Sequence, residues 1–377
     1  MNTSNHTSDI RSGRRVAAAC AVQALLVLGG CSGGGTPHMR LGSIPFPGPF
    51  TLYAVADPND LGQHSYEGAE RTSRGILYTA RAGFLDLSHV RESMDITRYA
   101  HDQIVAAMGG AGNGACVVFY IDWSDCEYSV LFHPPEWWEG LDADERAAIV
   151  AEAAIRQAQR LAIVIGTWHE IATWWGQETI PPFSEQNSAF TWDDTTSHVV
   201  AANIAGDALR DAPTPWNEAA TRRLSEKLGE LGVVGVDCEA KAVEAVHGRW
   251  WWSGVAIRRD LETGLATDWK TPWLVRGLDC CPEETPRPIA LPSLADVRGR
   301  DLRGAFELRI QPENWMVRRA LGCEECPSVL ASENDILAAI ERLRIAMYAE
   351  LGPDADNPDA PARHGEGAET SATARSR

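Results

Sequence analysis

The spacing of apolar residues predicts a chain in which helices dominate. Val90, Met94, Ile104 and Met108 recur at helical spacing, and Gly109-Gly110 follows them, which predicts a helix from Leu87 to Met108. The same periodicity predicts further helices over residues 142–165, continuing through 168–176, from the capping box at 191–194 to about 209, and over 215–231, 237–246 and 334–351. Pro215 lies in the first turn of one of them, where proline is tolerated.

Short runs of β-favouring residues lie between these helices. They cover residues 50–56, 75–80, 254–259 and 305–311, and residues 116–122 and 127–133 flank Trp123-Ser124 as a predicted hairpin. Residues 260–304 are rich in proline and are predicted to form loops. Strands and helices are mixed without strict alternation, so we expect an α+β fold: one helix-dominated globular domain over residues 51–351 with small antiparallel β elements.

The N-terminus has the pattern of a bacterial lipoprotein signal. Three arginines precede the apolar run Val16–Leu28, which is shorter than the roughly 20 residues needed to span a bilayer. The sequence Leu28-Gly29-Gly30-Cys31 then matches a lipobox, in which the cysteine is acylated and becomes the new N-terminus. We therefore expect residues 1–30 to be a signal peptide and Cys31 to be the lipidation site.

This pattern predicts an exported protein anchored to a membrane by lipid in the cell envelope. The residue after Cys31 is Ser32 and not aspartate, which resembles the default sorting signal for the outer membrane of Gram-negative bacteria. We expect the domain to face the periplasm. Residues 31–50 are predicted to be a flexible tether, because they combine a glycine run with spaced prolines. Residues 352–377 lack aromatic residues and are predicted to be a disordered tail.

The charge of the chain argues against nucleic acid as a partner. The formal net charge is −18, and removal of residues 1–30, with three Arg and one Asp, changes it to −20. Such a protein repels phosphate backbones and anionic lipid head groups.

The cysteines agree with export. Seven remain beyond Cys20 and Cys31, and in an oxidising compartment we expect disulfides. The candidates are Cys116, Cys126, Cys280, Cys281, Cys323 and Cys326. A turn centred on Trp123-Ser124 would place Cys116 opposite Leu131 and not opposite Cys126, so a Cys116–Cys126 disulfide is an open question. For the last four cysteines, a zinc knuckle is the alternative to disulfides.

His169-Glu170 is the first candidate for chemistry. A zinc protease helix has His-Glu-x-x-His, but here Thr173 stands where the second histidine belongs. Two interpretations stay open: His169 is packed in the core beside several tryptophans, or it is a metal ligand with Glu170 as the catalytic base and other ligands from elsewhere.

Asp86 and His89 are the best candidates for those other ligands. Asp86 lies where a strand-like segment gives way to a helix, so it can also cap that helix. His89 lies in the first turn, where the helix dipole favours neutral imidazole. Our hypothesis is a divalent metal such as zinc held by His89, His169 and Asp86, with all three converging on Glu170.

Two further groups of residues leave alternatives open. Thr191 to Asp194 resembles a capping box, and Asp194 and His198 lie one helical turn apart and could bond. Asp95 and Arg98 fit either a surface pair or a site carboxylate and the residue that positions it. The chain has 14 Trp, most of which should lie in the core, although the run Trp250–Trp252 cannot all face inward on one strand.

Three segments together resemble a bacterial envelope family described as domain of unknown function 4056. They are Gly83–Arg91 with Asp95, Thr97, Arg98 and Tyr99; Gly166–Gly176; and Phe183–Ser197 with Ser188–Phe190 and Asp194. The resemblance covers roughly residues 45–350. It implies a shared domain whose polar centre includes Asp86, His89, His169 and Glu170, and it transfers no mechanism.

Two functions of different classes follow from these observations. The first is a metal-dependent hydrolase that acts on an envelope component through a polar cleft. The second is a non-catalytic envelope protein that uses a tryptophan-rich surface for binding or assembly.

Overall fold

The computed structural model describes most of the chain beyond the expected tether. It covers residues 36–38, 40, 42, 55–66, 72–109, 115–121, 126–178, 185–211, 213–252, 255–281, 285–312, 314–322, 330 and 332–362. The expected signal peptide, Cys31, Cys323 and Cys326 lie outside these residues.

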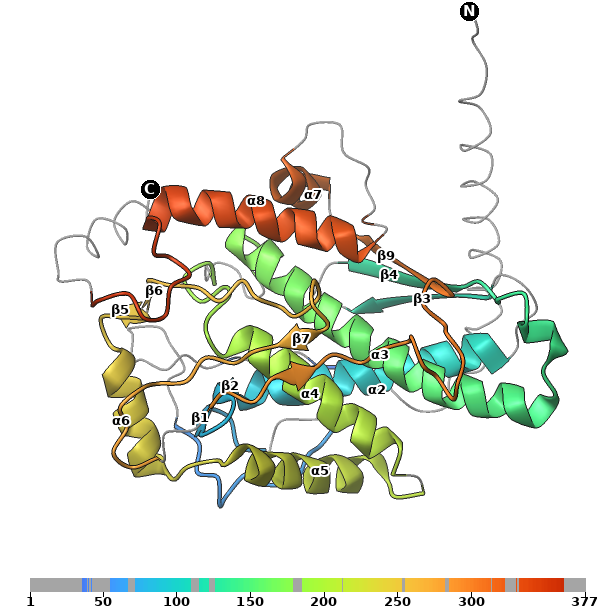
Figure 1. Cartoon of the computed structure of the whole chain (residues 1–377), viewed down its shortest axis with the longest axis horizontal. Helices are drawn as coiled ribbons and strands as arrows, with labels where there is room; N and C mark the ends of the chain where they lie inside the picture. The colour runs from blue at the N-terminus through green and yellow to red at the C-terminus, as the bar shows by residue number, and fades with distance from the viewer. Residues whose placement is uncertain are drawn as a thin grey trace, which may run out of the picture.

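Helices dominate the described residues, and small antiparallel sheets accompany them, as expected for an α+β fold (Figure 1). The helices are α2 (Leu87–Gly109), α3 (Ala143–Trp174), α4 (Asp194–Leu209), α5 (Trp216–Leu231), α6 (Val236–Val246), α7 (Asn314–Leu321) and α8 (Glu333–Leu351), with a short 3-10 turn, η2 (Trp138–Gly140). The helical spacing predicts all of them except α7. Among the described residues, none of these helices has the length and apolar character needed to cross a membrane.

The largest sheet has three strands in the order β3-β4-β9, all antiparallel. These strands are β3 (Ala115–Ile121), β4 (Cys126–Phe132) and β9 (Phe306–Gln311). The β3–β4 hairpin has the predicted register: Cys116 pairs with Leu131, and Cys126 pairs with Ile121.

The remaining strands form pairs that connect the helices. β1 (Ile76–Thr79) pairs with β2 (Gly83–Asp86), β5 (Trp251–Trp252) with β6 (Val255–Ala256), and β7 (Trp269–Lys270) with β8 (Ile289–Ala290). The predicted strand over residues 254–259 is therefore reduced to β6, because the chain beyond it turns away to pair elsewhere.

Helices α2, α3 and α4 pack against one another at the centre of the molecule (Figure 1). Helix α3 has 32 residues and runs without a break through Gly166. A Cβ atom at Gly166 would lie 2.7 Å from three atoms of the His198 ring on α4, so glycine permits the close approach of the two helices. This contact brings the start of α4 against the C-terminal half of α3.

Residues 352–362 pack against the domain, which differs from the expected disordered tail. Ala355 and Ala360 are buried, and the Ala355 carbonyl accepts a hydrogen bond from the Arg259 amide at 2.8 Å. The indole of Trp250 donates to the Pro358 carbonyl at 3.0 Å, so this segment covers one tryptophan of the Trp250–Trp252 run. The tail prediction failed here because alanine and proline carbonyls satisfy buried donors that the sequence alone does not reveal; residues 363–377 lie outside the described part.

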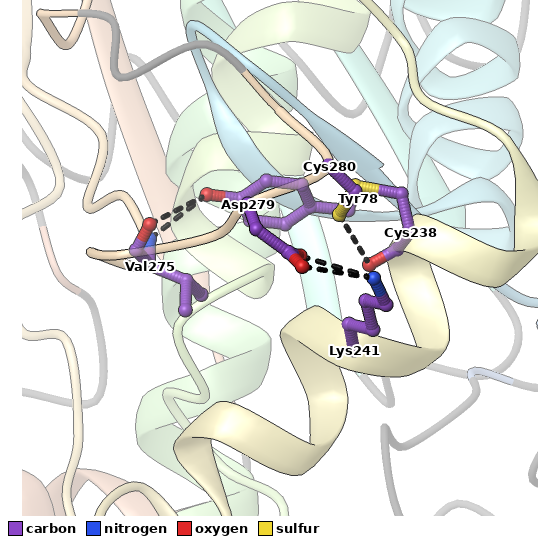
Figure 2. The surroundings of a disulfide bond; sticks show 6 residues. All are labelled: Tyr78, Cys238, Lys241, Val275, Asp279 and Cys280. Carbon is purple, nitrogen blue, oxygen red and sulfur yellow. Dashed lines mark hydrogen bonds and ion pairs between the residues drawn. A yellow bond between two sulfur atoms is a disulfide. The ribbon is translucent and has the colours of Figure 1, made fainter.

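A disulfide joins Cys238 at the start of α6 to Cys280 (Figure 2). Cys280 was a disulfide candidate, whereas its partner Cys238 was not among the candidates named from the sequence. Folding of α6 beside residues 275–281 brings Cys238 within 5.6 Å of Cys280, measured between Cα atoms. Cys126 and Cys281 are buried.

Candidate metal centre

The junction between β2 and α2 positions the first acidic side chain. Asp86 ends β2, and its Oδ1 accepts a hydrogen bond from the Ser88 amide at 2.6 Å, which caps α2. Its own amide donates to Ser197 Oγ on α4 at 3.0 Å. The carboxylate is fully buried, so the cap fixes it at the interface between α2 and α4.

His89 lies one turn further along α2, among carboxylates. Its Nδ1 is 3.2 Å from Asp194 Oδ1 and 3.9 Å from Asp86 Oδ2. Burial by itself lowers the pKa of His89, but Asp86, Asp194 and Glu170 together raise it well above its ordinary value. These carboxylates therefore favour the protonated imidazole, in the direction opposite to the neutral form expected from the helix dipole.

The start of α4 supplies two consecutive acidic side chains. Thr191 holds both of them: its hydroxyl is 2.8 Å from Asp193 Oδ1 and 2.9 Å from Asp194 Oδ2, and its amide donates to Asp194 Oδ2 at 2.6 Å. The bond from the Thr191 amide to Asp194 is one half of the predicted capping box. Burial raises the pKa values of Asp193 and Asp194, and the charge of a neighbouring carboxylate raises them further.

Glu170 reaches the same place from α3. Its Oε2 accepts a hydrogen bond from the amide of Phe190 at 2.8 Å, and Phe190 has a left-handed backbone with φ 56°. A buried aromatic residue in this conformation is unusual, and such strain concentrates at functional sites. Burial raises the pKa of Glu170.

His198 completes the cluster from the second turn of α4. Its Nδ1 is 2.8 Å from Ser93 Oγ on α2, and its Nε2 is 4.0 Å from Glu170 Oε1. The ring lies 5.5 Å from that of His89, measured between centroids. Burial lowers the pKa of His198 to about 3, which keeps the imidazole neutral. A neutral imidazole held through one nitrogen and open at the other is the form that binds metals.

Two sets of ligand atoms meet around His89. The side chains of Asp86, His89 and Asp193 can place one ligand atom each within 4.8 Å of the others, and so can those of His89, Glu170 and Asp194. These residues come from the end of β2, from α2, α3 and α4, and from the residue preceding α4, so three separate parts of the sequence contribute.

The electrostatics of the cluster fit a divalent cation. Four carboxyl groups share this interior with the imidazoles of His89 and His198, and burying carboxylates without a compensating cation is costly. Asp193 Oδ2 and His198 Nε2 are buried and have no hydrogen-bond partner among the described residues. Mixed imidazole and carboxylate ligands suit zinc, manganese or iron. A cation here would compensate the buried carboxylates and give both orphaned atoms a partner.

His169 differs from its neighbour Glu170, because among the described residues it belongs to neither set of converging ligand atoms. Burial first, and then the charges of His89 and His198, lower its pKa to about 3, so it lies within electrostatic reach of the cluster. Consecutive residues on a helix point about 100° apart, and of this pair only Glu170 places an atom in a converging set.

Asp95 and Arg98, for which sequence analysis left two roles open, have different surroundings. Asp95 is fully buried and accepts bonds from Arg40 Nη2 at 2.8 Å and from His64 Nε2 at 2.7 Å. Arg98 pairs with Asp102 one turn along α2 at the surface. Asp95 therefore binds the N-terminal segments that contain Arg40 and His64 to α2.

The segment that contains Arg40 and Gly42 also approaches the candidate metal centre. The Arg40 amide donates to Glu92 Oε2 at 2.6 Å, and a Cβ atom at Gly42 would lie 3.0 Å from His89 Nε2 and 3.2 Å from Asp86 Oδ2. Gly42 thus lies close to the Nε2 edge of the His89 ring and to the Asp86 carboxylate.

Sequence reasoning did not assign Asp193, Asp194 and His198 to the site. They were noted as a capping sequence and a possible helical pair, which is a local interpretation. A usable signal was present: two adjacent acids at a helix start, followed one turn later by histidine, in a stretch with few other charges.

Comparisons with known proteins agree with the resemblance of the sequence to domain of unknown function 4056. A family model described as "Protein of unknown function (DUF4056)" matches residues 25–260, which include every residue of the cluster. No curated protein and no solved structure matches the chain. Because the match covers more than half of the sequence, the chain belongs to the DUF4056 family of proteins of unknown function.

Proposed function

We propose that this domain is a divalent-metal-dependent hydrolase of a cell-envelope component, anchored to the outer membrane through lipid at Cys31. The observation that carries the proposal is the convergence of His89 with Asp86 and Asp193 on one side and with Glu170 and Asp194 on the other. Hydrolytic metal sites are built from such imidazole and carboxylate sets with a dry surrounding shell.

Asp86, His89, Asp193 and Asp194 are the residues that would hold the cation, with His198 as a further ligand. When bound, a divalent cation lowers the pKa of water and polarises a carbonyl or phosphoryl oxygen. The surrounding bonds orient the ligands: Ser88 and Ser197 fix Asp86, and Thr191 fixes the acidic pair.

Glu170 is the residue that we assign to proton transfer. Its Oε2 is occupied by the Phe190 amide, so Oε1, which faces His198, is the atom that would take or give a proton. Burial raises the pKa of Glu170 toward the range in which a carboxyl group works as an acid or base near neutral pH.

The test has a binding arm and a reaction arm. The full-length chain is stripped with a chelator, reloaded with Zn²⁺ or Mn²⁺, and its metal content is measured for wild type and for His89→Ala. His101→Ala is the matched control, since His101 lies on the same helix and pairs with Asp102 at the surface. We expect His89→Ala to lose at least tenfold in affinity and His101→Ala to match wild type.

The reaction arm uses purified peptidoglycan and phospholipid vesicles as substrates. We expect soluble products that require the metal, and we expect Glu170→Gln to abolish them while it keeps the metal. Metal binding without hydrolysis of either substrate would favour the non-catalytic envelope protein, and equal metal content in wild type and His89→Ala would refute the site itself.

A further inference from the structure

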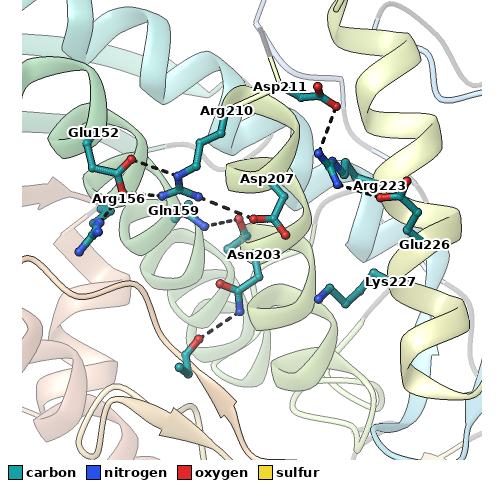
Figure 3. A network of polar contacts seen from close by, with 12 residues as sticks. Glu152, Arg156, Gln159, Asn203, Asp207, Arg210, Asp211, Arg223, Glu226 and Lys227 are labelled. Atoms are coloured by element: carbon teal, nitrogen blue, oxygen red, sulfur yellow. Dashed lines mark hydrogen bonds and ion pairs between the residues drawn. The ribbon is translucent and has the colours of Figure 1, made fainter. Parts of the chain in front are cut away.

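A second cavity lies away from the candidate metal centre, where α3, α4 and α5 meet the segment around β8. Its volume is about 640 Å³, within the range of small-molecule sites. On α4 the cavity is lined by Val200, Asn203, Asp207 and Arg210, so it begins close to His198 of the metal centre and extends along the helix toward Arg210. Figure 3 shows the polar side chains of the three helices around this space.

The lining combines donors and acceptors that neutralise one another. Glu152 pairs with Arg156 at 2.6 Å and with Arg210 at 2.8 Å, and Lys227 pairs with Glu230 at 2.7 Å. The cavity is thus polar but close to neutral in charge, although the whole chain carries −18. A surface of this kind suits an uncharged ligand with many hydroxyl groups better than it suits a strong anion.

One wall of the cavity is an exposed tryptophan. Trp269 is 52% exposed, the highest exposed fraction of the large aromatic side chains in the described residues. An indole offers a broad apolar face and one N–H donor. The C–H face of a pyranose ring packs on such a face while its hydroxyl groups bond to the surrounding polar side chains.

The backbone around Trp269 is fixed before any ligand arrives. Asp268 has a left-handed backbone with φ 60°, and its carboxylate accepts a bond from Arg160 on α3 at 2.9 Å. Trp269 pairs with Ala290 in the β7–β8 ladder, and the next residue, Lys270, is fully buried in an ion pair with Asp260. Strained backbone on a rigid support beside a cavity is typical of a preorganised binding site.

A close backbone contact supports the same geometry. A Cβ atom at Gly264, which has φ 80°, would lie 3.1 Å from the Trp269 carbonyl carbon and 2.6 Å from Leu291 Cδ1. Glycine is therefore required where this turn packs behind the tryptophan. The fold accommodates these constraints and still leaves the indole half in solvent.

We infer that this cavity is a binding site for a neutral saccharide, with Trp269 as the stacking platform. Arg287 would supply donors, and Asp207 would supply an acceptor. Asn203 donates to the Ala290 carbonyl and Arg156 to the Ser293 and Asp296 carbonyls, so these two side chains hold the wall of the cavity in place. Arg287 is exposed and lines the cavity, so it can turn toward a ligand. This inference stands apart from the metal centre, and it would give an envelope protein a means of docking on glycan.

The test measures binding of chitotriose, cellotriose and maltotriose to the full-length chain, by saturation-transfer NMR and tryptophan fluorescence. A chelator is present throughout, so the result does not depend on the metal. We expect at least one trisaccharide to bind with Kd on the order of 1 mM, an affinity typical of a small open site. Trp269→Ala should weaken it at least tenfold, and Trp269→Phe, which keeps an aromatic face, should weaken it only a few-fold.

Trp315→Ala is the matched control, because Trp315 on α7 is also exposed, at 39%, and lies outside the cavity. It should bind as wild type does. Because the Trp269 side chain is half exposed, Trp269→Ala should melt within a few degrees of wild type. Failure of all three trisaccharides to bind, equal binding by Trp269→Ala, or binding of inorganic phosphate in their place would overturn the inference.

Discussion

Removal of the Cys238–Cys280 disulfide should cost this domain about 4 kcal/mol of stability. The two residues are 42 positions apart, and the chain-entropy relation for a loop of that length gives about 4 kcal/mol at 25 °C. The perturbation is the double variant Cys238→Ala, Cys280→Ala, which removes the cross-link and leaves no thiol at either position.

Neighbouring contacts do not replace the cross-link. The ion pair between Lys241 and Asp279, drawn in Figure 2, joins two exposed side chains 3.0 Å apart, and solvent screening leaves such a pair with little effect on stability. The Val275 amide donates to the Tyr78 hydroxyl at 2.8 Å, and this buried bond keeps the loop near α6 in the variant. The variant should therefore fold and melt at a lower temperature.

Urea unfolding of the oxidised wild type and of the double variant gives the difference directly. For a domain of this size, 4 kcal/mol corresponds to a fall in Tm of roughly 8 °C. A difference below about 1 kcal/mol, with the disulfide verified in the wild type by peptide mapping, would refute the argument from loop entropy.

Two further predictions concern buried charges. Burial raises the pKa of Glu239 to about 9, so the folded state holds a proton that the unfolded state releases above its ordinary pKa. The stability that this proton contributes is complete below about pH 4.5 and is lost as pH rises toward 9. Between pH 5 and 8, pH-dependent denaturation should therefore show wild type losing about 4 kcal/mol more of its free energy of unfolding than Glu239→Gln loses. Glu244→Gln, on the exposed face of α6, is the control and should behave as wild type. Lys270→Met should destabilise the domain by about 3 kcal/mol or more, because it leaves the Asp260 carboxylate buried without its cation. The double variant Lys270→Met, Asp260→Leu should recover most of that loss in thermal unfolding, and a double variant as unstable as the single one would contradict this account.

The helices were predictable where periodicity and end signals agree. Helix α2 begins after the Asp86 cap and ends at Gly109, as its sequence indicates. Helix α3 passes through Gly166, whose cost in a helix of about 1 kcal/mol is outweighed by packing against α4. Helix α7 was missed because eight residues give too short a pattern, and β7 and β8 lie within the stretch predicted as loops because two residues give no pattern at all.

The site was predictable only in part, since its members are local on α2 and distant elsewhere. Asp86 and His89 lie one turn apart at a helix start, which a sequence can reveal. The pairing of that turn with Glu170 and Asp194 depends on how three helices pack, and no spacing encodes it. The adjacent His169 could not be separated from Glu170 until the orientation of α3 was known.

The measurement that tests the central claim most directly is anomalous scattering from a crystal of the zinc-loaded chain. The account predicts a zinc peak about 2.0–2.2 Å from a nitrogen of His89 and from carboxylate oxygens among Asp86, Asp193 and Asp194. The same crystal form of His89→Ala should lose that peak. A zinc-soaked crystal with no peak among these side chains, or with a peak that survives unchanged in His89→Ala, would contradict the assignment of this cluster as a metal centre.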